Sequence, residues 1–230
     1  MASGMGITLP PDPWYNLLYL LVCQWLPLGL LIAATTSNSP DSHTNWRSFD
    51  INHKDADVST RVQASLFTYR SEVNQANSAG DTKSIIKAGM YKGSDNSWCS
   101  SRVVDAYGDE CCDDVKITQE LAVASVCVFA VFVLILSGLV IATGKKIHRG
   151  WFVLCGISGI AACALYGHVL NVYSRKFDTG LCGYQDKTIN VSSVKFGSSY
   201  HTAIAGVVLG ILGSALVLFS RHEDTTYSGP

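Results

Sequence analysis

The sequence predicts a mainly α-helical integral membrane protein, a bundle of four transmembrane helices that carries a small extracellular β-sheet domain stapled by disulfides. Three observations predict this class. Four uncharged apolar segments are each long enough to cross a bilayer, whose hydrocarbon core of roughly 30 Å needs about 20 helical residues. The longest polar segment between them alternates like β-strands. Half of the eight cysteines lie outside the apolar segments.

The four apolar segments, residues 14–35, 121–143, 151–173 and 200–220, contain no Asp, Glu, Lys or Arg. Because backbone polar groups in lipid must be satisfied within the segment, we predict that each is a helix. Pro27 predicts a kink in the first. That segment ends in small residues that resemble a signal-peptidase site, so a cleaved signal peptide is the alternative. Its length and the lack of a basic region before it favour a retained helix.

The orientation of the chain follows from one short basic segment, residues 144–150, which holds Lys145, Lys146 and Arg149. Short loops rich in Lys and Arg stay on the cytosolic side of a membrane. The tails, residues 1–13 and 221–230, are then cytosolic as well. The large segment 36–120 and the smaller segment 174–199 are then extracellular or lumenal, most simply at the plasma membrane.

The cysteines divide between the two environments. Those outside the apolar segments are expected to form disulfides, because an oxidising compartment favours them. A bridge between the adjacent Cys111 and Cys112 is strained. We therefore expect one of them to pair with Cys99 and the other with Cys182, and which pairs with which is left open. The spacing does not fit a zinc site. The disulfide candidates are Cys99, Cys111, Cys112 and Cys182, and the cysteines within the helices are Cys23, Cys127, Cys155 and Cys163.

The outer segments contain three stretches with strand character. Residues 58–68 alternate with a period of two, although a polar helix is possible there, and residues 84–91 and 188–196 are two further candidates. We expect a small sheet to which both outer segments contribute. Asn190 begins an Asn-Val-Ser sequon and is a candidate glycosylation site. The acidic residues around Cys111 do not have the spacing of a calcium loop and are interpreted as a solvated acidic loop.

Small residues recur at four-residue steps in the third and fourth helices. This spacing lets helix backbones approach closely. We expect both stripes to face other helices, within one molecule rather than between molecules. The residues are Cys155, Gly159, Cys163 and Gly167 in the third helix and Thr202, Gly206, Gly210 and Ser214 in the fourth.

The order of these features resembles the claudin-like tetraspan superfamily. Trp46 opens the large outer segment, and Trp98-Cys99 is followed by Cys111 and Cys112, as a Trp and two cysteines follow one another in claudins. The resemblance implies four spans, cytosolic termini, and a large first and a smaller second outer loop. This sequence lacks the Gly-Leu-Trp that claudins have before the first cysteine, and Cys182 is not a claudin feature. A paracellular pore role therefore does not carry over.

These features predict a structural or adhesive membrane protein that assembles with itself or with other membrane proteins through its outer domain. The alternative is an accessory subunit of a channel, receptor or other membrane complex. An enzyme or transporter is less expected, because the helices lack charged residues. We predict no catalytic residue, metal or cofactor. With a net charge of -1 and no basic patch, nucleic acid is not an expected partner, and membrane lipids are.

Overall fold

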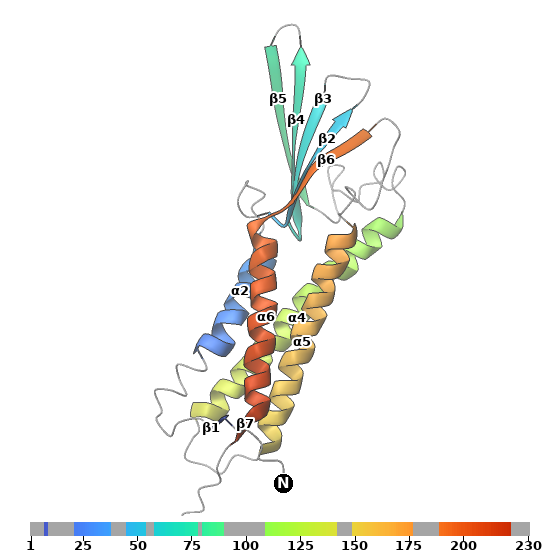
Figure 1. Ribbon diagram of the computed structural model, residues 1–230. Helices are drawn as coiled ribbons and strands as arrows, with labels where there is room; N and C mark the ends of the chain where they lie inside the picture. The colour runs from blue at the N-terminus through green and yellow to red at the C-terminus, as the bar shows by residue number, and fades with distance from the viewer. Residues whose placement is uncertain are drawn as a thin grey trace, which may run out of the picture.

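The computed structural model describes residues 7–8, 21–37, 45–53, 58–77, 80–89, 109–141, 149–176 and 189–221. The described helices form an elongated bundle, and a twisted sheet extends from one end of it (Figure 1). The helices are η1, a π-helix over Leu21–Trp25, then α2 (Leu26–Thr36), α4 (Asp109–Ile141), α5 (Arg149–Lys176) and α6 (Ser198–Phe219).

Three of these helices are long and apolar enough to cross a membrane. The stretches are Asp113–Leu139, Gly150–Arg175 and Ser198–Phe219, whereas the first apolar helix, Val22–Thr36, is shorter. The outward surface of the bundle is apolar as well, since Val131 on α4 and Leu154 on α5 are 57% and 56% exposed. A surface of this kind suits lipid rather than water, so the fold is that of an integral membrane protein.

Helix α4 begins at Asp109, well before the predicted start of the second apolar segment at residue 121. The acidic residues that we interpreted as a solvated loop therefore lie at its N-terminal end. The helix dipole is positive there, so Asp109, Glu110 and Asp113 favour an early start. Lys116 and Glu120 face each other one turn further on, at 4.0 Å. Local electrostatics thus extend the helix beyond its apolar part.

The predicted kink at Pro27 corresponds to a change of helix type. Pro27 lies in the first turn of α2, and the π-helix η1 ends immediately before α2. Proline has no amide hydrogen to donate to a carbonyl four residues earlier, so regular α-helical bonding cannot run through this point. The first position or two of a helix tolerate proline without penalty.

The sheet has five strands in the order β5-β4-β3-β2-β6, all antiparallel. Strand β6 comes from the smaller outer segment and pairs with β2 from the larger one. The prediction that both outer segments contribute to one sheet is therefore confirmed. The strands are β2 (Arg47–His53), β3 (Val58–Ala64), β4 (Thr68–Asn77), β5 (Gly80–Gly89) and β6 (Ile189–Phe196).

The alternating stretch 58–68 is not a single strand, so its predicted extent was wrong. It ends as β3 at Ala64 and resumes as β4 at Thr68, and the amide of Ser65 donates to the carbonyl of Thr68 over 2.7 Å. Of the residues that usually signal a turn, the turn contains Ser65 but no Gly, Pro, Asn or Asp, and serine is the weaker signal. Its stability comes from tertiary contacts, because Leu66 is buried and Gln119 of α4 donates to its carbonyl over 2.7 Å.

Strand β6 carries a bulge where it passes Phe49 of β2. The pairing shifts between Ser48, opposite Lys195, and Asp50, opposite Ser192. Ser193 lies in the shift with φ of 56° and is the sole residue other than glycine with positive φ in the described chain. A bulge of this type bends its strand and increases the local twist. The bend directs β6 toward Gly197 and the start of α6 (Figure 1).

The two described ends of the chain meet at the far end of the bundle from the sheet. Strand β1 (Ile7–Thr8) pairs in parallel with β7 (Ser220–Arg221), immediately after α6. In Figure 1 this pair lies at the opposite end from β2–β6. The chain therefore passes from one end of the bundle to the other between Thr8 and Asn45.

Candidate functional site

Trp46, at the base of β2, joins the sheet to the helix bundle. Its side chain is fully buried. The indole ring lies within 5.0 Å of the ring of Tyr173, 6.0 Å of Tyr200 and 6.5 Å of Tyr166, measured between ring centroids, with edge-on or tilted geometry. Aromatic pairs of this geometry contribute about 0.5–1.5 kcal/mol beyond their buried area. One side chain therefore connects the first outer strand to α5 and α6.

The polar atoms of Trp46 connect it to two more elements. Its indole Nε1 donates to the carbonyl of Ala34 in α2 over 2.9 Å. Its amide donates to Ala64 at the end of β3 over 2.8 Å, and its carbonyl accepts from Gly197, just before α6, over 3.0 Å. Every hydrogen-bonding group of this residue is thus used at the junction.

A second layer of the junction surrounds Arg47. The guanidinium of this buried residue lies over the ring of Phe196 at 3.8 Å from its centroid. That ring in turn stacks on Tyr200, with centroids 4.3 Å apart. A buried cation–π contact of this kind stabilises a cation that has lost water, by about 2 kcal/mol or more. It also fixes β2 against the end of β6 and the start of α6.

Gly197 is the link between β6 and α6, and its lack of a side chain is required. A Cβ atom there would clash with the backbone carbonyl and the side-chain oxygen of Asn45. The backbones of residues 45 and 197 therefore lie closer together than any other residue allows. Ser199 and Ser37 add a hydrogen bond between hydroxyls over 2.9 Å at the same level.

Further hydrogen bonds tie the junction to the helices. The hydroxyls of Thr35 on α2 and Tyr166 on α5 lie 2.7 Å apart, both buried. The hydroxyl of Tyr173 donates to the carbonyl of Ala64 over 3.5 Å. Together with the bond from Gln119 to the β3–β4 turn, these contacts fasten the sheet to α2, α4, α5 and α6. These contacts hold the sheet against one end of the bundle.

The face of the sheet that carries Asp50, Arg61 and Glu72 is charged. These residues are cross-strand neighbours in one row. Arg61 Nε donates to Asp50 Oδ1 over 2.9 Å, and this hydrogen bond raises the pKa of the Arg61 guanidinium. Arg70 pairs with Glu72 on the same face. The other face includes Phe49 and Val62, both buried.

Phe67 and Tyr69 are aromatics of the outer segment that a surface contact could use, but neither faces outward. Tyr69 is buried, which raises the pKa of its hydroxyl, and Phe67 packs against the core. Two large apolar residues on the edge strands of the described sheet are exposed: Ile85 on β5 is 49% exposed, and Phe196 on β6 is 39% exposed but stacks on Tyr200. Strand β5 pairs with β4 on one side alone.

The small-residue stripes meet inside one chain. A Cβ atom on Gly159 of α5 would clash with Ser214 of α6, and one on Gly210 of α6 would clash with Cys163 of α5. Gly167 lies near Val207 of α6. Gly206 instead packs against Leu31 of α2, Cys155 is buried against α4, and Thr202 is half-buried.

Two tight glycine contacts were not in the predicted stripes. Gly156 of α5 faces Leu218, and Gly213 of α6 faces the carbonyl of Cys23, which lies four residues before Pro27. Gln24, next to that carbonyl, is fully buried, and its amide finds no hydrogen-bond partner among the described residues. Spacing alone could have suggested Gly156 and Gly213, since Gly156 lies three residues before the stripe residue Gly159 and Gly213 lies three residues after the stripe residue Gly210.

Several predicted residues lie outside the described chain or near the ends of its elements. Cys99, Cys182, Lys145 and Lys146 lie outside it. Cys111 and Cys112 are in the first turn of α4, Arg149 begins α5, and Asn190 is in β6 opposite Asn52. The sequon residue Ser192 accepts a hydrogen bond from Asn52 over 3.1 Å. In the described part of the helices, Cys23, Cys127, Cys155 and Cys163 are free thiols.

The residues of the junction at Trp46 hold elements of the fold together. Across the described ranges, no three His, Cys, Asp or Glu side chains are placed to hold a metal ion. The groups that converge at Trp46 and Arg47 join α2, β3, β6 and α6 to one another. No protein-family model matches the chain, and no curated protein matches it in sequence.

Proposed function

We propose that this chain is a claudin-like tetraspan protein that assembles with copies of itself or with other membrane proteins through its outer sheet. The observation that carries the proposal is the junction at Trp46, which mounts a sheet from both outer segments rigidly on the helix bundle. A rigid platform presents its edges and faces in a fixed orientation to neighbours in the membrane or on an opposing one. This reduces the entropy that association would otherwise cost.

The pairing of β1 with β7 supports a fourth crossing by the first helix. The chain must travel the length of the bundle between Thr8 and Asn45, and Leu21–Thr36 accounts for about 24 Å of that distance at 1.5 Å per residue. The apolar residues from Trp14 to Leu20 provide enough further chain to complete the crossing. Both termini then lie on one side, with the basic segment between α4 and α5.

Positive charge in short loops sets that side as cytosolic, so the sheet is extracellular or lumenal. In that compartment the four outer cysteines form two bridges. Cys111 and Cys112 follow one another on a helix, where successive positions differ by about 100° around the axis. Neighbours so placed do not face each other, which favours a separate partner for each.

The edge of the sheet at β5 is the proposed contact surface for a second copy. Edge strands present unpaired backbone groups that can extend a sheet across two molecules. Strand β5 is ten residues long and Ile85 is exposed on it, whereas β6, at the other edge, is bent by its bulge. Two copies paired through β5 would bring their Ile85 side chains close together.

Cross-linking in intact cells tests this contact. We expect Ile85→Cys to give a covalent dimer with a membrane-impermeant bis-maleimide, because the two edges would lie within reach of the reagent. Asn74→Cys is the matched control, since Asn74 is also exposed but lies on the inner strand β4. Equal cross-linking of both variants, or of neither, would contradict pairing through β5. Ile85→Cys cross-linked to one different protein would point to an accessory subunit.

A further inference from the structure

Strand β5 directs one set of backbone groups to the edge of the described sheet. The amide of Ser65 donates to the carbonyl of Thr68, so position 68 of β4 bonds toward β3. Because the direction of bonding alternates along a strand, the odd positions of β4 bond toward β5. Their partners are the even positions of β5, such as Ser84 opposite Val73. The backbone groups that point to the open edge of β5 are therefore those of Asp81, Lys83, Ile85, Lys87 and Gly89.

The middle of this edge is accessible from both faces of the sheet. Ser84 and Ile85 are both exposed, and successive residues of a strand lie on opposite faces. An identical edge on a second copy can meet it through a two-fold axis perpendicular to the sheet, because this axis makes the two β5 strands antiparallel. The two sheets then become one continuous sheet.

The hydrogen bonds between the two edges restrict how the strands align. Only registers that join odd positions to odd positions match donors with acceptors, so an axis between Ser84 and Ile85 is excluded. Two of the allowed registers pair nine of the ten residues of β5, more than any other. With Ser84 on the axis, residues 80–88 pair with residues 88–80 of the second copy. With Ile85 on the axis, residues 81–89 pair with residues 89–81.

Charge selects between these two registers. With Ile85 on the axis, Lys83 lies opposite Lys87 of the second copy, twice by symmetry. With Ser84 on the axis, Asp81 lies opposite Lys87 of the second copy, again twice. Opposite charges that face each other across antiparallel strands stabilise the pair, and like charges destabilise it. The β5 edge is therefore complementary to itself in the register centred on Ser84.

We propose that β5 binds β5 of a second copy with Ser84 on the two-fold axis and with Asp81 of each copy paired to Lys87 of the other. This contact rests on the assembly through β5 proposed above and adds its partner and its geometry. The strands of the sheet extend away from the helix bundle, along the length of the molecule (Figure 1). Because the axis reverses the strand direction, the two bundles lie at opposite ends of the joined sheet, roughly 30 Å apart at about 3.4 Å per residue. The two copies are thus anchored in opposing membranes.

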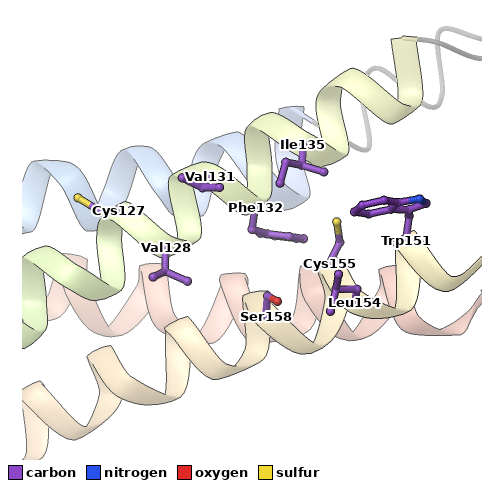
Figure 2. A pocket seen from close by; sticks show the side chains of 9 residues that line it. All are labelled: Cys127, Val128, Val131, Phe132, Ile135, Trp151, Leu154, Cys155 and Ser158. Carbon is purple, nitrogen blue, oxygen red and sulfur yellow. The ribbon is translucent and has the colours of Figure 1, made fainter.

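Contact through the helix bundle is the alternative, and it would join two copies within one membrane. Figure 2 shows the described groove between α4 and α5, which has a volume of about 320 Å³ and is lined by residues such as Val131, Phe132 and Leu154. None of the residues that line it is charged, so the groove does not distinguish a second copy from another apolar surface. The charge pattern of β5 makes that distinction.

Adhesion between vesicles tests the partner and the register together. The full chain is reconstituted into vesicles with two fluorescent labels, and co-clustering of the labels is measured. Asp81→Lys and Lys87→Asp each place like charges in both pairs, so vesicles carrying either variant alone should adhere about tenfold less than wild-type vesicles. Vesicles carrying Asp81→Lys mixed with vesicles carrying Lys87→Asp should adhere like the wild type, because the two changes restore opposite charges in both pairs. Val131→Trp, which fills the groove, is the control and should leave adhesion unchanged.

Cysteine substitutions locate the axis. On oxidation, Ser84→Cys should give a disulfide-linked dimer, because a residue on the axis at a non-hydrogen-bonded position has its Cα about 4.5 Å from that of its copy. Ile85 lies diagonally from its copy, at about 7–8 Å, so Ile85→Cys should need the bis-maleimide. A disulfide through Ile85→Cys in place of Ser84→Cys would put the axis at Ile85 and overturn the register.

The other outcomes separate this contact from the assembly on which it rests. Cross-linking of Ile85→Cys without rescue in the mixed vesicles would overturn the charge pairing and leave assembly through β5 standing. Rescue only when both variants share one vesicle would overturn the opposing-membrane arrangement. Loss of adhesion with Val131→Trp would place the contact in the bundle. Absence of any cross-link through Ser84→Cys or Ile85→Cys would overturn both the contact and the assembly through β5.

Discussion

The indole nitrogen of Trp46 donates a hydrogen bond to the carbonyl oxygen of Ala34 across 2.9 Å. Ala34 lies two residues before the end of α2, so its carbonyl is one of the last four in the helix and has no intrahelical donor. A residue at the start of the sheet domain thus supplies the missing donor at the end of α2. The sheet and the bundle share this bond, which couples their stabilities.

Replacing Trp46 by Phe should destabilise the protein by about 1–3 kcal/mol, because the buried Ala34 carbonyl loses its donor. Trp46→Ala should cost about 3–5 kcal/mol by leaving a cavity among three tyrosines. Thermal unfolding in detergent micelles measures both. The control is Trp25→Phe, which also removes an indole hydrogen bond, to Ser137 over 3.1 Å, but from a residue that is 41% exposed. Equal losses for Trp25→Phe and Trp46→Phe would contradict the role of the junction.

The hydroxyl pair of Thr35 and Tyr166 should behave as one coupled unit. Hydrogen bonds between helices in membrane proteins contribute about 0.6 kcal/mol, with a maximum of about 1.7. We expect Thr35→Val and Tyr166→Phe each to destabilise the bundle, and the double variant to cost less than the sum by about that amount. A double-mutant cycle on unfolding in detergent gives the coupling energy. Additive losses would mean that the two hydroxyls, 2.7 Å apart, do not interact.

The contact between α5 and α6 should tolerate no added methyl group. Gly159→Ala and Gly210→Ala each place a Cβ against a side chain of the facing helix. Overpacking of this kind costs about 1–3 kcal/mol. Gly138→Ala is the matched control, since nothing lies within 4 Å of its Cβ position on α4. It should be neutral or slightly stabilising, because alanine favours helix over glycine. Losses as large for Gly138→Ala would show that helix packing is not the cause.

The bulge at Ser193 should depend on backbone conformation rather than on the serine hydroxyl. Its φ of 56° is accessible to glycine without strain. A β-branched residue is a steric outlier there, and the left-handed conformation costs about 1–2 kcal/mol. We therefore expect Ser193→Val to be less stable than Ser193→Gly by roughly this amount, as measured by unfolding of the purified protein. A Ser193→Val variant as stable as Ser193→Gly would contradict the strained conformation.

The helices were predictable from sequence because the lipid solvent imposes a strong constraint: a long uncharged run must satisfy its own backbone. Strands β3 and β6 were predictable from their period of two and part of β5 was expected, whereas β2 and most of β4 were not predicted. The ends of the helices and strands were not predictable, because they depend on helix-dipole charges and on tertiary contacts rather than on hydrophobic pattern. Helix α4 starts early at Asp109, where acidic residues match the helix dipole. The turn at Ser65–Phe67 is held by Gln119, a residue more than fifty positions away.

The candidate site was only partly predictable. Trp46 was identified through resemblance, yet nothing local to it shows that it would meet Tyr166, Tyr173 and Tyr200. Those tyrosines lie in or next to apolar segments and look like interfacial aromatics, a pattern that many membrane helices share. Arg47 would ordinarily be placed at the surface, because charged side chains are seldom buried. Its burial over Phe196 exists only once β2 and β6 are neighbours.

The most direct test of the account is the side of the membrane on which the sheet and the basic segment lie. In intact cells treated with a membrane-impermeant maleimide, Arg61→Cys should be labelled, since Arg61 is 58% exposed on the sheet. Lys146→Cys and a cysteine added to either terminus should be labelled only after permeabilisation. Labelling of Lys146→Cys from outside, or of one terminus without the other, would contradict four crossings with an outer sheet.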